Sequence, residues 1–99
     1  PMNERRATIL DLVTETYIRS VAPVASSHIS EQLQVSSATI RNELAALEDE
    51  GYLQQPHTSA GRIPTTRAYQ QYAYKFIPPS ELPLLQQKLV LQGLRRVHG

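Results

Sequence analysis

Arg41 and Asn42 are neighbouring residues whose side chains can each form two hydrogen bonds in one plane. Arginine pairs in this way with guanine and asparagine with adenine, and arginine also binds phosphate. Two small residues, Ala38 and Ala45, lie about one helical turn away on either side, where they would permit close approach to a thymine methyl group. These four residues therefore predict contacts with base edges. The alternatives are a surface salt bridge for Arg41 and an exposed amide without a role for Asn42.

Hydroxyl groups cluster at the start of the same segment, at Ser36, Ser37 and Thr39. If a helix begins here, its free N–H groups and its dipole favour a phosphate at this end. Ser36 and Ser37 can also cap the helix, and capping is compatible with phosphate binding. The acidic run at residues 48–50 would repel phosphate. Only the first two turns of the helix are therefore expected to enter a DNA groove.

A second candidate group lies in the polar segment that follows, and its members are His57, Thr58, Ser59, Gly61 and Arg62. Small hydroxyls and backbone N–H groups suit sugar–phosphate contacts, and Gly61 removes bulk. Arg62 can reach a phosphate or a narrow minor groove, and Arg67 is a further candidate for a phosphate contact. The alternative is an ordinary polar turn followed by a solvated arginine.

Helices and a short hairpin must position these residues, and apolar periodicity and turn residues predict where they lie. The first and third predicted helices span about 4–19 and 37–50. The other three are each expected to follow a capping residue, at Ser26 or Ser27, at Thr65 or Thr66 and at Ser80, and to end near residues 33, 76 and 97. Two predicted strands, 52–55 and 62–63, enclose a turn at 56–61, and Pro64 is expected to stop the strand pairing. This order of elements is typical of a helix-turn-helix followed by a wing.

Capping residues support the predicted ends of three helices. Asn3 is expected to cap the first helix, and Ser26 or Ser27 the second. Gly51 follows the third helix, at the position where φ is usually positive. The turn of the helix-turn-helix then falls at 34–36.

Apolar residues predict which side of each helix is buried. In the third helix Ile40, Leu44 and Leu47 fall on one side. The first helix has an inner stripe of Ile9, Leu10, Val13 and Tyr17. A stripe of Tyr69, Tyr72, Ala73 and Phe76 in the fourth helix is expected to pack against the first helix, with a base-stacking platform as the alternative.

Together the elements predict a mainly α fold with a small β-hairpin. Residues 3–77 are predicted to form a winged helix-turn-helix DNA-binding domain. Residues 78–99 are predicted to form a linker and an extra amphipathic C-terminal helix with apolar positions at Leu82, Leu85, Leu89 and Leu94. We expect this helix to lead to a C-terminal domain that the chain lacks. Pro1 before Met2 is expected to be the remnant of a tag.

Composition excludes several classes of function. The 99 residues suffice for one small core and contain no Cys, so disulfides and thiolate metal sites are excluded. No apolar run approaches the roughly 20 residues of a membrane span, and no signal peptide is recognisable. His28, His57 and His98 are too scattered to predict a metal site, and no phosphate-binding loop or nucleophile motif occurs. We therefore expect a cytoplasmic protein that is not an enzyme and needs no cofactor.

The net charge of +1 hides an asymmetry between the two halves of the chain. Residues 1–50 contain four Arg and eight Asp or Glu, a balance of −4, whereas residues 51–99 contain four Arg, two Lys and one Glu, a balance of +5. A basic face directed at a phosphate backbone is the functional interpretation. An ordinary solvated surface is the alternative.

The sequence resembles the HrcA family of heat-inducible transcription repressors over roughly residues 4–75. The resemblance rests on SSATIRNE at 36–43, Leu47-Glu48, Gly51-Tyr52-Leu53 and PHTSAGRIP at 56–64. Upstream, Tyr17-Ile18-Arg19 and Pro23-Val24 also resemble this family. One departure is Gln34, which stands where the family often has a turn glycine.

The resemblance implies a bacterial, cytoplasmic repressor of chaperone operons that binds an inverted-repeat operator in double-stranded DNA as a homodimer. It also implies a larger C-terminal region, similar to a GAF domain with an inserted segment, that supplies dimerisation and the response to chaperonin. The alternative function is a winged helix that makes protein contacts without reading DNA. A basic, unobstructed face around Arg41, Asn42 and Arg62 would argue against that alternative.

Overall fold

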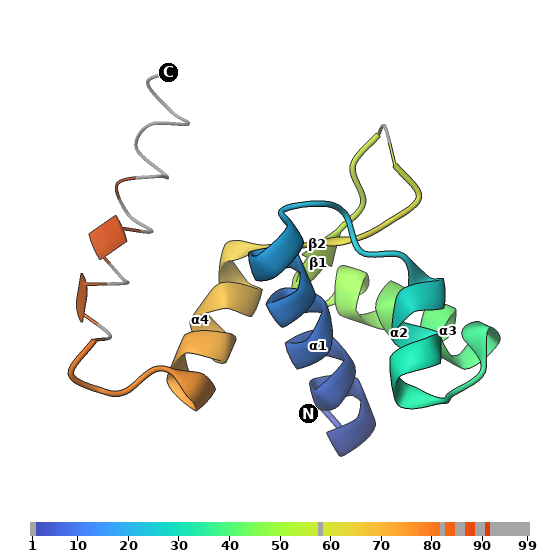
Figure 1. Ribbon diagram of the computed structural model, residues 1–99, viewed down its shortest axis with the longest axis horizontal. Coiled ribbons are helices and arrows are strands. Elements are labelled where there is room, and N and C mark those ends of the chain that lie inside the picture. The colour runs from blue at the N-terminus through green and yellow to red at the C-terminus, as the bar shows by residue number, and fades with distance from the viewer. Residues whose placement is uncertain (1, 58, 82, 85–86, 89–90, 92–99) are drawn as a thin grey trace. The chain divides into compact units, whose positions relative to one another are not determined.

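The computed structural model describes residues 2–57, 59–81, 83–84, 87–88 and 91 (Figure 1). The elements follow in the order α1 (Glu4–Ser20), α2 (Ser26–Leu33), α3 (Ser37–Asp49), β1 (Leu53–Gln54), β2 (Ile63–Pro64) and α4 (Thr66–Phe76). The mainly helical class with one small hairpin is confirmed. The chain forms two compact units, residues 1–69 and 70–99. The predicted domain boundary between residues 77 and 78 stays a prediction.

The core of the first unit lies where α1, α2 and α3 pack on one another, with the β1–β2 hairpin beside α1 and α3 (Figure 1). Its buried residues are Ile9, Leu10, Val13, Val24, Ile29, Ile40, Leu44, Leu47, Leu53 and Ala68. The predicted inner side of α3 is confirmed, and so are three of the four residues predicted for the inner stripe of α1. The fourth, Tyr17, packs against the core but stays partly exposed.

A side-chain cap marks the start of α1 but not that of α2. The side chain of Asn3 accepts a hydrogen bond from the Arg6 amide at 2.7 Å, as predicted. For α2 the predicted serine cap is wrong, because the helix already begins at Ser26. Its N-cap is Ala25, which has no side chain able to bond the free N–H groups.

The turn between α2 and α3 is closed by backbone and side-chain bonds to one serine. Val35 donates its amide to the Ser30 carbonyl at 3.3 Å, and the Ser30 hydroxyl donates to the Val35 carbonyl at 2.6 Å. Gln34 adopts φ +55°, a left-handed conformation that favours glycine. The turn therefore forms without the glycine that is common at this position in the family it resembles. At the other end of α3, Gly51 has φ +83°, as predicted.

The hairpin is shorter than predicted, with the antiparallel pairs Leu53–Pro64 and Gln54–Ile63. The expectation that Pro64 stops the pairing is confirmed in part, because β2 ends at Pro64 although Pro64 itself is paired with Leu53. Proline cannot donate a hydrogen bond, and the next bond beyond it runs from the Thr65 amide to the Tyr52 carbonyl (3.0 Å).

A second pairing, which the sequence did not predict, joins the hairpin to the α1–α2 connection. Val24 and Arg62 exchange two backbone hydrogen bonds, at 2.8 and 2.9 Å. Gly61 lies so close to this connection that an added Cβ would be 2.9 Å from Pro23 atoms. Glycine is therefore required by a close approach within the protein at this position.

The C-terminal part of α4 differs from the predicted stripe. Ala73 is buried and Tyr69 and Tyr72 are partly buried, but Phe76 is 55% exposed. Assigning Phe76 to the core is wrong, because it is the last residue of α4 and stacks on Tyr72, with ring centroids 4.7 Å apart.

The predicted helix at 80–97 falls largely outside the described residues, including all four of its named leucines. Within it, Pro83, Leu84, Gln87, Lys88 and Leu91 have helical conformations and are exposed.

Candidate nucleic-acid interface

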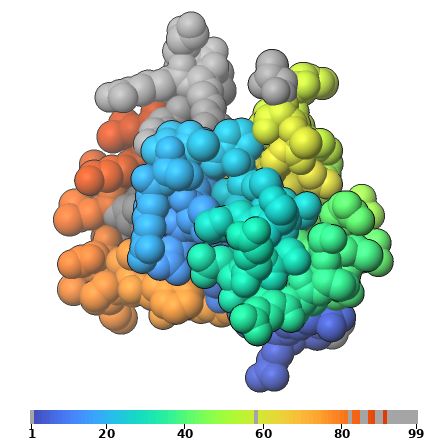
Figure 2. Space-filling model, turned by 45° about the vertical axis from the view of Figure 1, so that its right-hand side comes forward, coloured from blue at the N-terminus to red at the C-terminus, as the bar shows by residue number. Residues whose placement is uncertain are grey.

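One face of α3 is open to solvent and carries the residues predicted to contact bases. Ile40, Glu43, Leu44 and Leu47 are buried on the inner side of the helix. The exposed side carries Ser37, Ala38, Arg41, Asn42 and Ala45. Thr39 is half-buried. In Figure 2 the surface of α3 (green) and that of the hairpin (yellow) lie on the same side of the molecule. The helical period therefore brings these predicted residues together.

The side chains of Arg41 and Asn42 are available for a ligand. Both residues are exposed, and neither side chain has a hydrogen bond or ion pair with any residue that the structure describes. This contrasts with every other arginine in the first unit, whose guanidinium in each case has a hydrogen-bond or ion-pair partner. The salt bridge considered as an alternative for Arg41 is thus not formed within residues 2–57 and 59–69.

The N-terminus of α3 combines a cap with an exposed hydroxyl. Ser36 accepts from the Thr39 amide at 3.3 Å and donates to the Thr39 hydroxyl at 2.9 Å. The two side chains are thereby engaged with each other. Ser37 is exposed in the first turn, where the helix dipole is positive. Of the three hydroxyls, Ser37 is the best placed to meet a phosphate.

A buried carboxylate that the sequence reasoning missed holds α3 on α1. Glu43 accepts from Arg6 Nη2 at 3.0 Å and from Arg5 Nε at 3.4 Å, and its side chain is only 8% exposed. Arg6 also reaches Glu50 at 3.3 Å. A sequence signal existed, because Glu43 lies on the inner side between Ile40 and Leu44, where a charge needs a partner.

The hairpin tip is ordered by short-range hydrogen bonds. The Ser59 hydroxyl accepts from the Gly61 amide at 3.0 Å, and the Gln55 side chain donates to the carbonyls of Ser59 and Ala60 at 3.5 Å. His57 is exposed, Ser59 is half-buried and Gly61 is buried. Thr58 lies outside the described residues. Of the residues predicted in the tip, His57 is therefore open to a ligand and Ser59 partly so.

Both arginines predicted to bind phosphate contact the C-terminal end of α3. Arg62 Nε lies 2.9 Å from a carboxylate oxygen of Glu48, and Arg62 Nη1 donates to the Ala60 carbonyl at 3.1 Å. Arg67 donates to the Glu50 carbonyl at 2.5 Å, and its guanidinium lies 4.4 Å from the ring centroid of Tyr52. Neither arginine is brought to the open face of α3.

Metal-ligating groups and membrane spans are other features that would reveal a function. Among the described residues, no group of three His, Cys, Asp or Glu side chains could hold a metal ion. None of the helices in the described ranges is long and apolar enough to cross a membrane.

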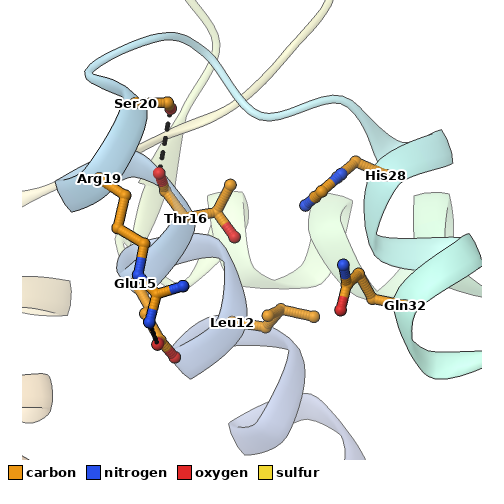
Figure 3. Close-up of a pocket in the computed structure, with 7 residues that line it drawn as sticks. All are labelled: Leu12, Glu15, Thr16, Arg19, Ser20, His28 and Gln32. Carbon is orange, nitrogen blue, oxygen red and sulfur yellow. Dashed lines mark hydrogen bonds and ion pairs between the residues drawn. The ribbon is translucent and has the colours of Figure 1, made fainter.

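A surface hollow of about 440 Å³ lies between α1 and α2 (Figure 3). His28 and Gln32 of α2 point across it towards α1. Arg19 pairs with Glu15 at 2.7 Å and Ser20 donates to the Thr16 carbonyl at 3.0 Å, so these groups are already satisfied within their own helix. We assign no binding role to this hollow.

The three-helix core, the exposed α3 and the hairpin define a winged helix-turn-helix, a class of DNA-binding fold. Residues 2–77 match the sequence model described as the winged helix-turn-helix transcription repressor HrcA, DNA-binding, and the chain belongs to this family. A family of transcription repressors is not a class of enzymes.

Named relatives agree with this family. The chain is 54% identical over 82 residues to the heat-inducible transcription repressor HrcA of Bifidobacterium longum. That match covers 78% of the chain and 22% of the relative, so the chain spans about a fifth of the relative's length.

Solved structures agree with the fold. A crystal structure of a hypothetical protein has a TM-score of 0.71 and 42% identity, covering 75% of this chain and 24% of the other. Streptococcus pneumoniae FabT, crystallised in complex with DNA, has a TM-score of 0.57 over 97% of this chain and 78% of its own. At a sequence identity of 15%, this structural likeness is evidence for the winged-helix fold and for nothing more specific.

Proposed function

We propose that this chain is the operator-reading domain of a bacterial, cytoplasmic transcription repressor that binds an inverted repeat in double-stranded DNA near heat-shock and chaperone genes. The observation that carries the proposal is the open face of α3, on which Arg41 and Asn42 have no partner among the described residues. The relatives named heat-inducible transcription repressors support the choice of target genes.

In this proposal the first two turns of α3 enter the major groove. Asn42 forms two hydrogen bonds with an adenine, and Arg41 pairs with a guanine or a phosphate. Ala38 and Ala45 allow the backbone to approach and contact thymine methyl groups. Ser37 and the free N–H groups of the first turn bind a phosphate of the groove wall.

The hairpin tip contacts the sugar–phosphate backbone beside the groove. His57, which is exposed, and Ser59, which is half-buried, are proposed for this contact, and Thr58 is included from the sequence. Such contacts set the position of α3 but carry no sequence information directly. Two copies of the domain would each read one half of the inverted repeat, at centres about 34–36 Å apart or a multiple of that distance. Dimerisation and a chaperonin response are assigned to the C-terminal region of the full-length protein.

The second candidate, a winged helix that only binds proteins, is less well supported. The exposed large apolar residues in the described ranges are Ile18, Val21, Tyr74, Phe76, Leu84 and Leu91. None of these lies on α3 or on the hairpin, so the open face lacks the apolar centre typical of protein interfaces.

The test is a titration of the chain against an inverted-repeat duplex and a scrambled duplex of equal length, each at two salt concentrations. We expect tighter binding to the inverted repeat at both salt concentrations, with weaker binding to both duplexes as salt rises. Equal affinity for the two duplexes, or no salt dependence, would contradict sequence-specific operator binding.

A further inference from the structure

The hairpin is too small to fix its own orientation. Each of its strands, β1 and β2, has two residues. A two-stranded hairpin is marginally stable in water unless other contacts support it. If the tip is to meet DNA at a fixed place relative to α3, residues outside the two strands must hold it there.

Arg62, the residue before β2, supplies such contacts in three directions. Its backbone pairs with Val24 of the α1–α2 connection. Its Nε lies 2.9 Å from a carboxylate oxygen of Glu48 on α3, and its Nη1 donates to the carbonyl of Ala60 in the tip. The side chain is only 17% exposed. Because Nε is covered and has no aligned hydrogen bond to any described residue, its contact with Glu48 is an ion pair.

We propose that Arg62 is a positioning residue, which fixes the hairpin tip relative to α3 through its ion pair with Glu48, and is not itself a phosphate contact. This inference rests on the proposed function of DNA binding. Arg62 and Glu48 together would hold the hairpin tip and the open face of α3 in a fixed arrangement, so that both contact DNA as one surface.

The charges and the packing favour this role over a free basic arm. The carboxylate of Glu48 offsets the positive charge that Arg62 would offer to a phosphate. If Arg62 moved to the DNA, it would leave Glu48 unpaired close to the phosphates. The close contact of Gly61 with Pro23 also limits how far the adjoining backbone can move. By contrast with Arg62, Arg41 is exposed and so is available to contact a phosphate or a base.

The test uses the 99-residue chain with Arg62→Gln, Glu48→Gln and the double substitution. Asp49→Asn is the control for charge, because Asp49 is exposed, adjacent to Glu48, and has no ion pair with a described residue. Arg41→Gln is the control for an arginine available to DNA. Binding to the inverted-repeat duplex is measured at several salt concentrations, and amide chemical shifts at 59–61 are measured without DNA.

We expect Arg62→Gln and Glu48→Gln each to weaken binding about fivefold to tenfold, with the double substitution no worse than either, as in coupled pairs. The salt slope should stay unchanged for Arg62→Gln and fall by about 1 for Arg41→Gln. Without DNA, the amide shifts at 59–61 should move in Glu48→Gln but not in Asp49→Asn.

Two results would overturn the inference. The first is a salt slope that falls by about 1 in Arg62→Gln. The second is that Glu48→Gln binds the inverted-repeat duplex more tightly, by the same factor as Asp49→Asn, and leaves the amide shifts at 59–61 unchanged. The shift measurement needs no DNA, so a failure of DNA binding in the unsubstituted chain would contradict the proposed function and leave the Arg62–Glu48 contact separately tested.

Discussion

Arg6 of α1 directs both its Nε and its Nη2 at the same oxygen of Glu43 on α3, at 3.3 and 3.0 Å. Glu43 follows Asn42 directly in the chain. The ion pair therefore fixes the inner side of α3 at the position next to the outward-facing Asn42. Arg5 contacts the second carboxylate oxygen, which leaves both oxygens occupied. The geometry couples the orientation of the open face to α1.

Glu43→Ala is therefore expected to destabilise the fold by about 1.5–3 kcal/mol, because it removes the charged hydrogen bonds that two arginines of α1 make to α3. Urea unfolding followed by circular dichroism measures this free energy. Glu50→Ala is the control, since Glu50 binds the same Arg6 but its side chain is 41% exposed, and an exposed pair contributes about 0–1 kcal/mol. Equal destabilisation by the two substitutions would contradict the role given to Glu43.

Val21 has φ +54° and is 72% exposed, so a β-branched side chain occupies a left-handed conformation without the benefit of burial. That conformation costs about 1–2 kcal/mol for a residue with a Cβ. Val21→Gly is expected to stabilise the chain by about 0.5–1 kcal/mol, after allowance for the larger entropy of glycine in the unfolded state. Ala22→Gly, at an adjacent exposed position without positive φ, should be destabilising. Thermal unfolding of both variants is the measurement, and a lower melting temperature for Val21→Gly than for the unsubstituted chain would refute the strain.

Much of the fold was predictable because it depends on short-range patterns. The spacing of Ile40, Leu44 and Leu47 defines the inner side of α3, and this also places Arg41 and Asn42 outside. Local chemistry likewise predicted the Asn3 cap and the positive φ of Gly51.

The features that were not predicted depend on contacts between residues far apart in the chain. The pairing of Val24 with Arg62 requires that the α1–α2 connection lie beside the hairpin, which no local pattern shows. For the same reason the sequence presented Arg62 as an available charge, although Glu48 lies beside it in the fold. Ala68 joins the core although a small residue gives little periodic signal.

Arg67 is expected to stabilise the end of α3. Its guanidinium donates to the Glu50 carbonyl and stacks on Tyr52, and such contacts contribute about 0.5–1 kcal/mol each at exposed sites. Arg67→Gln should therefore lower the free energy of unfolding by about 1 kcal/mol. Tyr52→Leu, alone and combined with Arg67→Gln, completes the double-mutant cycle that gives the coupling between the two residues. Strictly additive effects would show that the stacking contributes nothing.

Asn42→Ala tests where sequence specificity resides. Asn42 is exposed and has no partner among the described residues, so its removal should leave the melting temperature unchanged. A bidentate contact to a base contributes about 1–3 kcal/mol of discrimination, which is the expected loss on the inverted-repeat duplex, with little change on a scrambled duplex.

Leu44→Ala is the matched control on the opposite side of the same helix. Leu44 is 1% exposed, and its truncation should destabilise the fold by about 2–5 kcal/mol. At temperatures where this variant is still folded, its preference for the inverted repeat should persist, because the open face of α3 is intact. The two variants thus separate binding from folding. If Asn42→Ala retained the full preference for the inverted repeat, direct reading of a base by Asn42 would be ruled out, and Arg41, the hairpin or the shape of the DNA would have to supply the specificity.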